Sequence, residues 1–379
     1  MKMSKKLISL LLAVLMVVTL LPTLALADDD DVAAVSETGQ VLETVSGFQF
    51  PTYTVYCSLL NKLPASHAVI TLTDNLTGES TTHTANALGI AFIKTTVFSP
   101  LKHVYSVAAT CDGPLSGLKY STLPGIRWTM DGKIDHDKLL LYPILNIGLN
   151  YTDHFAYMVG YPDGTFMPQA NITRAEVAAI IYRLMTPESR AKFSSADCMF
   201  SDVQAGMWFN ESVCTLVKAG IISGYPDGTF KPNQSITRAE FSSMIARMFS
   251  VSYVGNNSFE DINGHWAQSY MNILSKLGIL KGDSNGNANP DANLTRAEAA
   301  AMCNRLVGRN STNSSLNSCK DPITSWPDVS NGAWFYADVL EATNSHDYTW
   351  TLNVKNLVSG EFVITEQWTK LRTDAPDWK

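Results

Sequence analysis

Three arginines at matching positions are the residues of this chain best suited to chemistry. Arg174, Arg238 and Arg296 each lie inside a five-residue run of the form Ile/Leu-Thr-Arg-Ala-Glu. A planar guanidinium donates paired hydrogen bonds to a carboxylate. A helix that begins at such a run adds positive potential and free amide groups beside it. For one copy alone a solvated helix residue is the better interpretation, but three copies in register favour an anion-binding role.

Residue combinations typical of catalysis or metal binding are missing from the sequence. The seven histidines contain no HExxH and no pair at helical metal spacing. Asp135–Asp137 has a histidine between two carboxylates, which is more typical of a polar turn. Asp283–Asn287 is similar to a calcium loop, but Ala288 and Leu294 replace its glycine and glutamate. We therefore expect no enzyme, no cofactor and no metal site, although a glycosidase-type carboxylate pair among the 35 acidic residues stays open.

The arginines belong to a larger unit that repeats. A glycine-rich block precedes the first two arginines as Gly160–Phe166 and Gly224–Phe230, both reading GYPDGTF, and decays to GDSNGNA at Gly282–Ala288. Proline and glycine in such a block predict a tight turn. A further block with an aromatic residue, an aspartate and a following tryptophan opens the later units; its residues include Asp202, Trp208, Asp261 and Trp266. Blocks that recur in a fixed order indicate stacked units.

Each unit is predicted to be helix-turn-helix. The threonine and glutamate of each five-residue run form a capping box at a helix start, with the pairs Thr173 and Glu176, Thr237 and Glu240, and Thr295 and Glu298. Apolar residues follow at the spacing of one buried helix face. Asp202 and Asp261 lie where a helix N-cap is expected. Trp208 and Trp266 would then lie in the first turn as structural or groove-lining residues, with packing in the core favoured over stacking against a sugar.

This combination closely resembles the S-layer homology (SLH) domain over residues 150–348. The resemblance implies three units assembled with pseudo-threefold symmetry, which attach an exported protein non-covalently to a secondary cell-wall polysaccharide, often pyruvylated. It implies that the three arginines bind the glycan, with Gly160, Tyr161, Gly224 and Tyr225 as candidates for the groove floor. The third turn has lost its tyrosine, proline, aspartate and phenylalanine, which predicts a weakened or inactive groove there.

The first unit lacks its opening block, and an extra one appears late in the chain. Trp326–Val329, containing Asp328 and followed by Trp334, has no turn or arginine run after it. The simplest hypothesis is that residues 326–348 supply the helix missing from the first unit. The predicted repeats span 144–190, 197–252 and 256–310, followed by a polar linker at 311–325 and a closing half-repeat with a tail at 326–379.

The N-terminal part is expected to form a separate domain. A short basic stretch, an apolar run and Ala25–Ala27 indicate a secretory signal peptide at 1–27, followed by an acidic leader at 28–46. Alternating apolar residues and frequent turn signals at 47–143 predict a small antiparallel β-sandwich. The expected fold class is therefore α+β multidomain, a β-sandwich followed by an all-α pseudo-threefold SLH trimer. Disulfides between Cys57 and Cys111, and between Cys198 and Cys214, stay open, and Cys303 is expected as a buried thiol.

The composition and charge of the chain argue against nucleic acid and membrane as partners. The net charge of −7 gives no broad basic surface for nucleic acid, and no apolar stretch outside the signal peptide is long enough to span a membrane. The expected function is a secreted anchor on a cell-wall polysaccharide, with peptidoglycan-associated surface proteins as further partners. The alternatives are a self-assembling surface lattice and, less favoured, a wall-tethered polysaccharide hydrolase.

Overall fold

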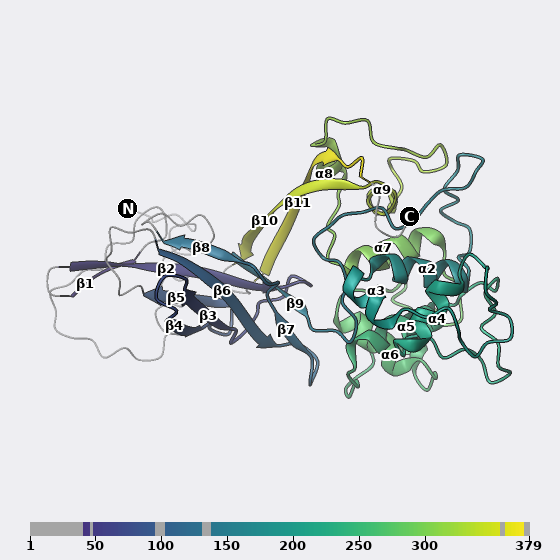
Figure 1. Ribbon diagram of the computed structural model, residues 1–379, viewed down its shortest axis with the longest axis horizontal. Helices are drawn as coiled ribbons and strands as arrows, with labels where there is room; N and C mark the ends of the chain where they lie inside the picture. Colours follow the sequence, from purple (N-terminus) through teal and green to yellow (C-terminus); the bar gives the residue numbers. More distant parts are fainter. Residues whose placement is uncertain (1–40, 46–47, 95–102, 131–137, 357–360, 375–379) are drawn as a thin grey trace, which may run out of the picture.

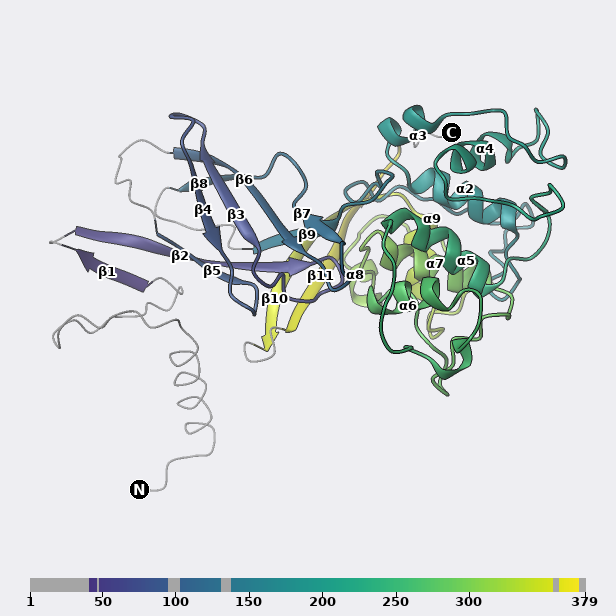
Figure 2. The same ribbon diagram turned by 90° about the horizontal axis from the view of Figure 1, so that it is seen from below.

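The structure is a computed structural model that describes residues 41–45, 48–94, 103–130, 138–356 and 361–374. The predicted signal peptide lies outside the described residues. Of the predicted acidic leader, Val41–Val45 form a strand. A strand-rich body stands at one end of the molecule and a helical body at the other, with a long β-hairpin between them (Figures 1 and 2).

The strand-rich body is one mixed sheet of nine strands. Hydrogen bonds connect the strands in the order β1-β2-β9-β7-β6-β3-β4, with β5 on β2 and β8 on β6. Because β4 and β5 also contact each other, the sheet curves almost into a barrel. The strands are β1 (Val41–Val45), β2 (Phe48–Leu59), β3 (Val69–Asp74), β4 (Ser80–Thr84), β5 (Ile90–Lys94), β6 (His103–Asp112), β7 (Lys119–Ser121), β8 (Arg127–Met130) and β9 (Lys138–Pro143).

The expected antiparallel β-sandwich is therefore wrong. The long strand β2 pairs with β9 in parallel, with Tyr56 opposite Lys138 and Leu59 opposite Leu141. Strand β9 buries three consecutive leucines, which suits a strand covered on both faces rather than one face of an open sandwich. Alternation predicts that a segment is a strand, but it does not predict its partner or direction.

The helical body contains three helix pairs. In each pair, a helix that begins at one of the three arginines packs against a later helix of the chain: α2 on α4, α5 on α6 and α7 on α9. The described helices are α2 (Arg174–Leu184), α3 (Pro187–Phe193), α4 (Asn210–Lys218), α5 (Arg238–Ala246), α6 (Gln268–Lys276), α7 (Arg296–Leu306), α8 (Asn313–Asn317) and α9 (Tyr336–Thr343), with short 3-10 turns η1 (Arg247–Phe249) and η2 (Glu260–Ile262).

Backbone hydrogen bonds close the three units into a ring. The amide of Ile172 donates to the carbonyl of Leu294, that of Leu294 to Ile236, and that of Ile236 to Ile172. Thr173, Thr237 and Thr295 follow these three residues, and each caps the helix start through a complete capping box. The ring therefore fixes all three helix starts around one centre.

The expectation of an all-α repeat region is also wrong. Strands β10 (His346–Asn356) and β11 (Glu361–Leu371) form an antiparallel hairpin where only a half-repeat and tail were expected. The hairpin lies between the sheet and the helices in both views (Figures 1 and 2). The predicted polar linker contains α8, which begins with its own capping box at Thr312. The alternating aromatic residues of this segment are a signal for strands, which a prediction based on the repeats alone does not use.

The late opening block lies against the first turn. The carboxylate of Asp328 accepts hydrogen bonds from the amides of Phe166 and Met167, at 3.0 and 2.7 Å. Asp202 contacts the second turn and Asp261 the third through the same pair of bonds. These aspartates therefore join each opening block to a turn, and the expectation that Asp202 and Asp261 are N-caps is wrong.

Two further observations concern the cysteines and the membrane. All six cysteines are free thiols, and Cys303 is fully buried. Among the described residues, no helix combines the length and the apolar character that crossing a bilayer requires.

Replacing Asp328 tests the joint between the chain end and the first turn. In Asp328→Ala two backbone amides lose their acceptor, so we expect a loss of about 1–2 kcal/mol in the free energy of unfolding. Circular dichroism melting should show a Tm lower by about 3–6 °C. The control is Asp291→Ala, whose carboxylate is exposed and faces only His265, and which should leave Tm unchanged. An equal Tm for both variants would contradict this role of Asp328.

Candidate functional site

The three arginines lie at the contacts between neighbouring units, not in solvent. Arg174, Arg238 and Arg296 are 4%, 7% and 4% exposed. The Nε of each donates to a turn carbonyl of another unit, at 2.7–2.8 Å. Arg238 also donates to the carbonyl of Lys281 and to the carboxylate of Glu298. Three of its five N–H groups are thus used in contacts within the described part of the chain.

The capping-box glutamates serve two contacts at once. In Glu176, Oε2 accepts from the amide of Thr173 while Oε1 lies 3.2 Å from the guanidinium of Arg296. The corresponding ion pairs are Arg174 with Glu240 at 3.2 Å and Arg238 with Glu298 at 2.7 Å. Each unit therefore donates an arginine to one neighbour and offers a glutamate to the other. Removing the charge from a buried ion pair leaves its partner unpaired, which is strongly unfavourable.

Aromatic rings cover two of the three guanidinium groups. Arg296 lies 4.7 Å from the ring centres of both Tyr161 and Phe166. Arg174 lies 4.6 Å from Tyr225 and 4.8 Å from Phe230. Burial and a hydrogen bond to Glu240 raise the pKa of Tyr225 to about 12, so its hydroxyl stays protonated and donates. Tyr161 and Tyr225 therefore lie over the arginines.

The third turn lacks both rings, and a groove opens there. Asp283 replaces the tyrosine and Ala288 the phenylalanine. A cavity of about 520 Å³ lies beside Arg238, and its lining includes Lys281, Arg305 and Trp334. The groove beside Arg238 thus lies where the two rings that cover the other arginines are missing.

The tryptophans of the opening blocks face solvent. Trp208, Trp266 and Trp334 are 63%, 59% and 62% exposed, so the expected core packing of Trp208 and Trp266 is wrong. Each tryptophan lies just before a helix N-cap, and the residue that follows it is buried instead. Three large apolar rings held outward at equivalent positions are unusual for a purely structural role.

The predicted groove-floor glycines are packing positions. A Cβ on Gly160 would lie 2.1 Å from the Trp326 ring, and one on Gly224 would lie 2.1 Å from Phe200. The aromatic residue of an opening block therefore rests directly on the turn glycine. Trp326 takes at the first turn the place that Phe200 takes at the second.

A second set of arginines was missed by the sequence analysis. Arg183, Arg247 and Arg305 each lie nine residues after one of the first arginines. Each is half-buried, and its guanidinium Nη1 donates to a backbone carbonyl. The three carbonyls belong to Tyr157, Ile221 and Ile279 respectively. Arg305 lines the groove beside Arg238. Aligning the repeats beyond their most similar blocks would have revealed this set.

With this geometry in place, comparison with known proteins decides the family. Residues 156–178, 200–242 and 258–300 match the model of the S-layer homology domain. The chain carries an S-layer homology domain. The matched segments contain all three turns and the amino-terminal part of all three arginine-led helices, so the ring described above is the SLH part of the chain.

Relatives of this part of the chain include a cell-surface protein, an anchoring protein and an enzyme. Cell surface glycoprotein 1 of Acetivibrio thermocellus is 33% identical over 208 residues, covering 52% of this chain and 9% of the relative. The cellulosome-anchoring protein of the same organism is 32% identical over 204 residues, covering 52% and 44%. An amylopullulanase of Thermoanaerobacterium thermosulfurigenes is 35% identical over 157 residues, covering 39% and 8%.

The chain spans less than half the length of these relatives. The similarity therefore concerns the SLH part, and it places this protein with exported proteins at the cell wall or surface layer.

The burial of Arg238 predicts that its removal affects folding as well as binding. Arg238→Ala leaves two carbonyls and the Glu298 carboxylate without their donor. The free energy of unfolding, measured by urea denaturation, should therefore fall by about 2–4 kcal/mol. Arg127→Ala, on the exposed surface of β8, is the matched control and should stay within about 0.5 kcal/mol of the parent chain. An unchanged unfolding midpoint for Arg238→Ala would show that the ring does not depend on this contact.

Proposed function

We propose that the SLH ring anchors this protein non-covalently to an acidic polysaccharide of the cell wall, with the groove beside Arg238 as the principal binding position. One observation carries the proposal. Arg238, Lys281 and Arg305 line the same groove as the exposed ring of Trp334. Cations and an aromatic face around one open space are suited to a sugar that carries a carboxylate.

The charges in the groove favour an anion. Glu298 is paired with Arg238, and Asp283 accepts hydrogen bonds from the amides of Asn285 and Asn287. These backbone hydrogen bonds, together with one from the Asn289 side chain, lower the pKa of Asp283 and occupy its oxygens. Lys281 and Arg305 then leave an excess of positive charge in a chain whose net charge is −7.

The groove also offers contacts for a neutral sugar ring. The Trp334 indole is held at right angles to Phe335, with ring centres 5.4 Å apart, and Phe335 is buried. The indole face is thus fixed and available for stacking against a sugar face. Asn293 and Ser284 are exposed in the same lining and supply hydrogen-bonding groups for hydroxyls.

The other two contacts between units differ in their chemistry. The expected glycan positions at Arg174 and Arg296 are covered by Tyr225 and Tyr161, so we propose them as weaker binding positions. Weak grooves still add to attachment on a polymer, because one bound groove raises the effective concentration of the glycan at the next. We propose a pyruvylated glycan as the ligand, because its ketal carboxylate matches the cations around Arg238.

The test is co-sedimentation of the full chain with purified cell walls, before and after chemical removal of the secondary polysaccharide. The double variant Lys281→Ala/Trp334→Ala changes exposed side chains only, so the ring should stay folded. Loss of two contacts of about 1 kcal/mol or more each predicts at least about tenfold weaker wall binding. The matched control is Phe92→Ala, an exposed aromatic residue on β5.

Three outcomes would contradict the proposal. Binding that survives removal of the polysaccharide would mean that the ring binds another wall component. Equal binding by the folded double variant and the control would exclude the groove beside Arg238. Large assemblies of the full chain without walls, seen by sedimentation velocity, would favour a self-assembling lattice.

A further inference from the structure

Four buried side chains converge where the start of the SLH part meets the end of the chain. His154 precedes the first turn, Glu341 lies on α9, His346 begins β10, and Glu366 lies on β11. Their exposed fractions are 3%, 0%, 1% and 3%. One ligand atom from each side chain lies within 4.8 Å of those of the others. We refer to these four residues as the His₂Glu₂ cluster.

The spacing of the cluster matches the coordination shell of a metal ion. His154 Nδ1 lies 3.0 Å from Glu341 Oε1, 3.1 Å from His346 Nε2 and 3.5 Å from Glu366 Oε1. His346 Nε2 lies 3.4 Å from Glu341 Oε2 and 3.7 Å from Glu366 Oε1. Bonds of about 2.0–2.2 Å from a tetrahedral zinc ion separate its ligand atoms by about 3.3–3.6 Å.

Outer contacts hold the ligand atoms toward the centre. His346 Nδ1 lies 3.0 Å from the carbonyl oxygen of Asn344, which only accepts, so Nδ1 carries a hydrogen. Glu366 Oε2 accepts from the amide of Asn310. Glu341 Oε2 accepts from Ser311 and from the Trp368 indole. Such partners are typical of the second shell around a metal.

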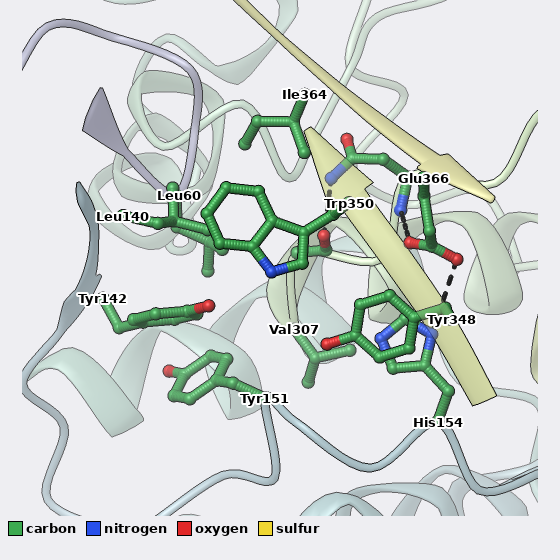
Figure 3. Close-up of a pocket in the computed structure, with 12 residues that line it drawn as sticks. Leu60, Leu140, Tyr142, Tyr151, His154, Val307, Tyr348, Trp350, Ile364 and Glu366 are labelled. Atoms are coloured by element: carbon green, nitrogen blue, oxygen red, sulfur yellow. Dashed lines mark hydrogen bonds and ion pairs between the residues drawn. The ribbon is translucent and has the colours of Figure 1, made fainter. Parts of the chain in front are cut away.

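The inner carboxylate oxygens have no such partner. Among the described residues, Oε1 of Glu341 and Oε1 of Glu366 are buried and accept no hydrogen bond. Two buried carboxylate oxygens without donors are costly unless a cation lies between them. Glu366 is seen turned toward His154, whose ring stacks on Tyr348 (Figure 3).

Hydrogens on the two histidines do not supply donors for all the buried carboxylate oxygens of this cluster. Because His154 Nδ1 and His346 Nε2 are 3.1 Å apart, hydrogens on both would collide, so at most one of the two carries a hydrogen. Arg309 adds one positive charge 3.6 Å from Glu341 Oε1, but the same guanidinium donates to the carbonyls of Phe155 and Asp153. A divalent cation at the centre would lie within reach of a ligand atom from each of the four side chains.

From this geometry we infer that the His₂Glu₂ cluster is a structural site for a divalent transition-metal ion, with zinc as the ion of first choice. Imidazole and carboxylate ligands together suit zinc and its first-row neighbours. Four protein ligands complete a tetrahedral shell, which is typical of a structural rather than a catalytic site. The ion would join His154 to a helix and a hairpin that lie nearly two hundred residues later in the chain.

A small cavity lies against the His₂Glu₂ cluster. It has a volume of about 20 Å³ and is lined by His154 and Glu366 together with Tyr348 and residues of the β-sheet body. This space accommodates about one water molecule. The cavity therefore lies beside the cluster, where the hairpin meets the sheet.

The experiment measures metal content and metal spectra of the purified full chain. After zinc loading and desalting, elemental mass spectrometry should find one zinc ion per chain. Cobalt(II) in place of zinc should give the intense visible bands of a four-coordinate ion. Sulfur-to-cobalt charge-transfer bands should be missing, because the ligands are nitrogen and oxygen. Chelation of the zinc should lower Tm by several degrees.

Glu366→Gln removes one ligand charge with little change in shape, and Glu188→Gln, an exposed residue on α3, is the matched control. We expect zinc affinity to fall at least about tenfold in the first variant and to stay unchanged in the second. Equal zinc affinity in folded Glu366→Gln would overturn the site.

The wild-type measurements decide the question even if Glu366→Gln fails to fold. A parent chain that takes up no zinc, or a cobalt spectrum with sulfur bands from the six free cysteines, would overturn the site. Neither result bears on binding to cell walls, which is measured separately.

Discussion

The helical body depends on one repeated contact, the arginine that crosses from the start of one helix to the turn and the glutamate of the next unit. Its guanidinium donates to a turn carbonyl and to a partly exposed carboxylate of another unit. The same glutamate completes the capping box of its own helix. Helix starts, turns and contacts between units are thus a single hydrogen-bonded network, and no unit completes it alone.

This dependence explains which features the sequence could predict. Capping boxes and tight turns are local, so the starts of α2, α5 and α7 follow from the residues around Thr173, Thr237 and Thr295. The exposure of Trp208 is not local, because it depends on Phe209 being the residue that faces the core. The parallel pairing of β2 with β9 could likewise not be predicted, since the residue pattern of a strand does not indicate which strand it pairs with.

Residues that meet across long separations were the hardest to predict. His154 and His346 are 192 positions apart and belong to no shared motif. The alternation in β11 even argues for a buried position at Glu366, where a carboxylate is unexpected. A buried acid in a strand is the one local signal that a search of the sequence would have found. Its meaning appears only when α9 and the hairpin are folded against the first unit.

Differences among the repeats carry more functional information than their similarities. At the first two turns the tyrosine and phenylalanine close over the arginine, and the contact between units is fully packed. At the third turn both rings are gone, while the hydrogen bonds of Arg238 that hold the ring together are all kept. The groove beside Arg238 therefore lies at the contact that has lost its aromatic residues and kept its hydrogen bonds. The part of the contact that the three units share holds the ring together, and the part that differs forms the groove to which we assign the proposed binding.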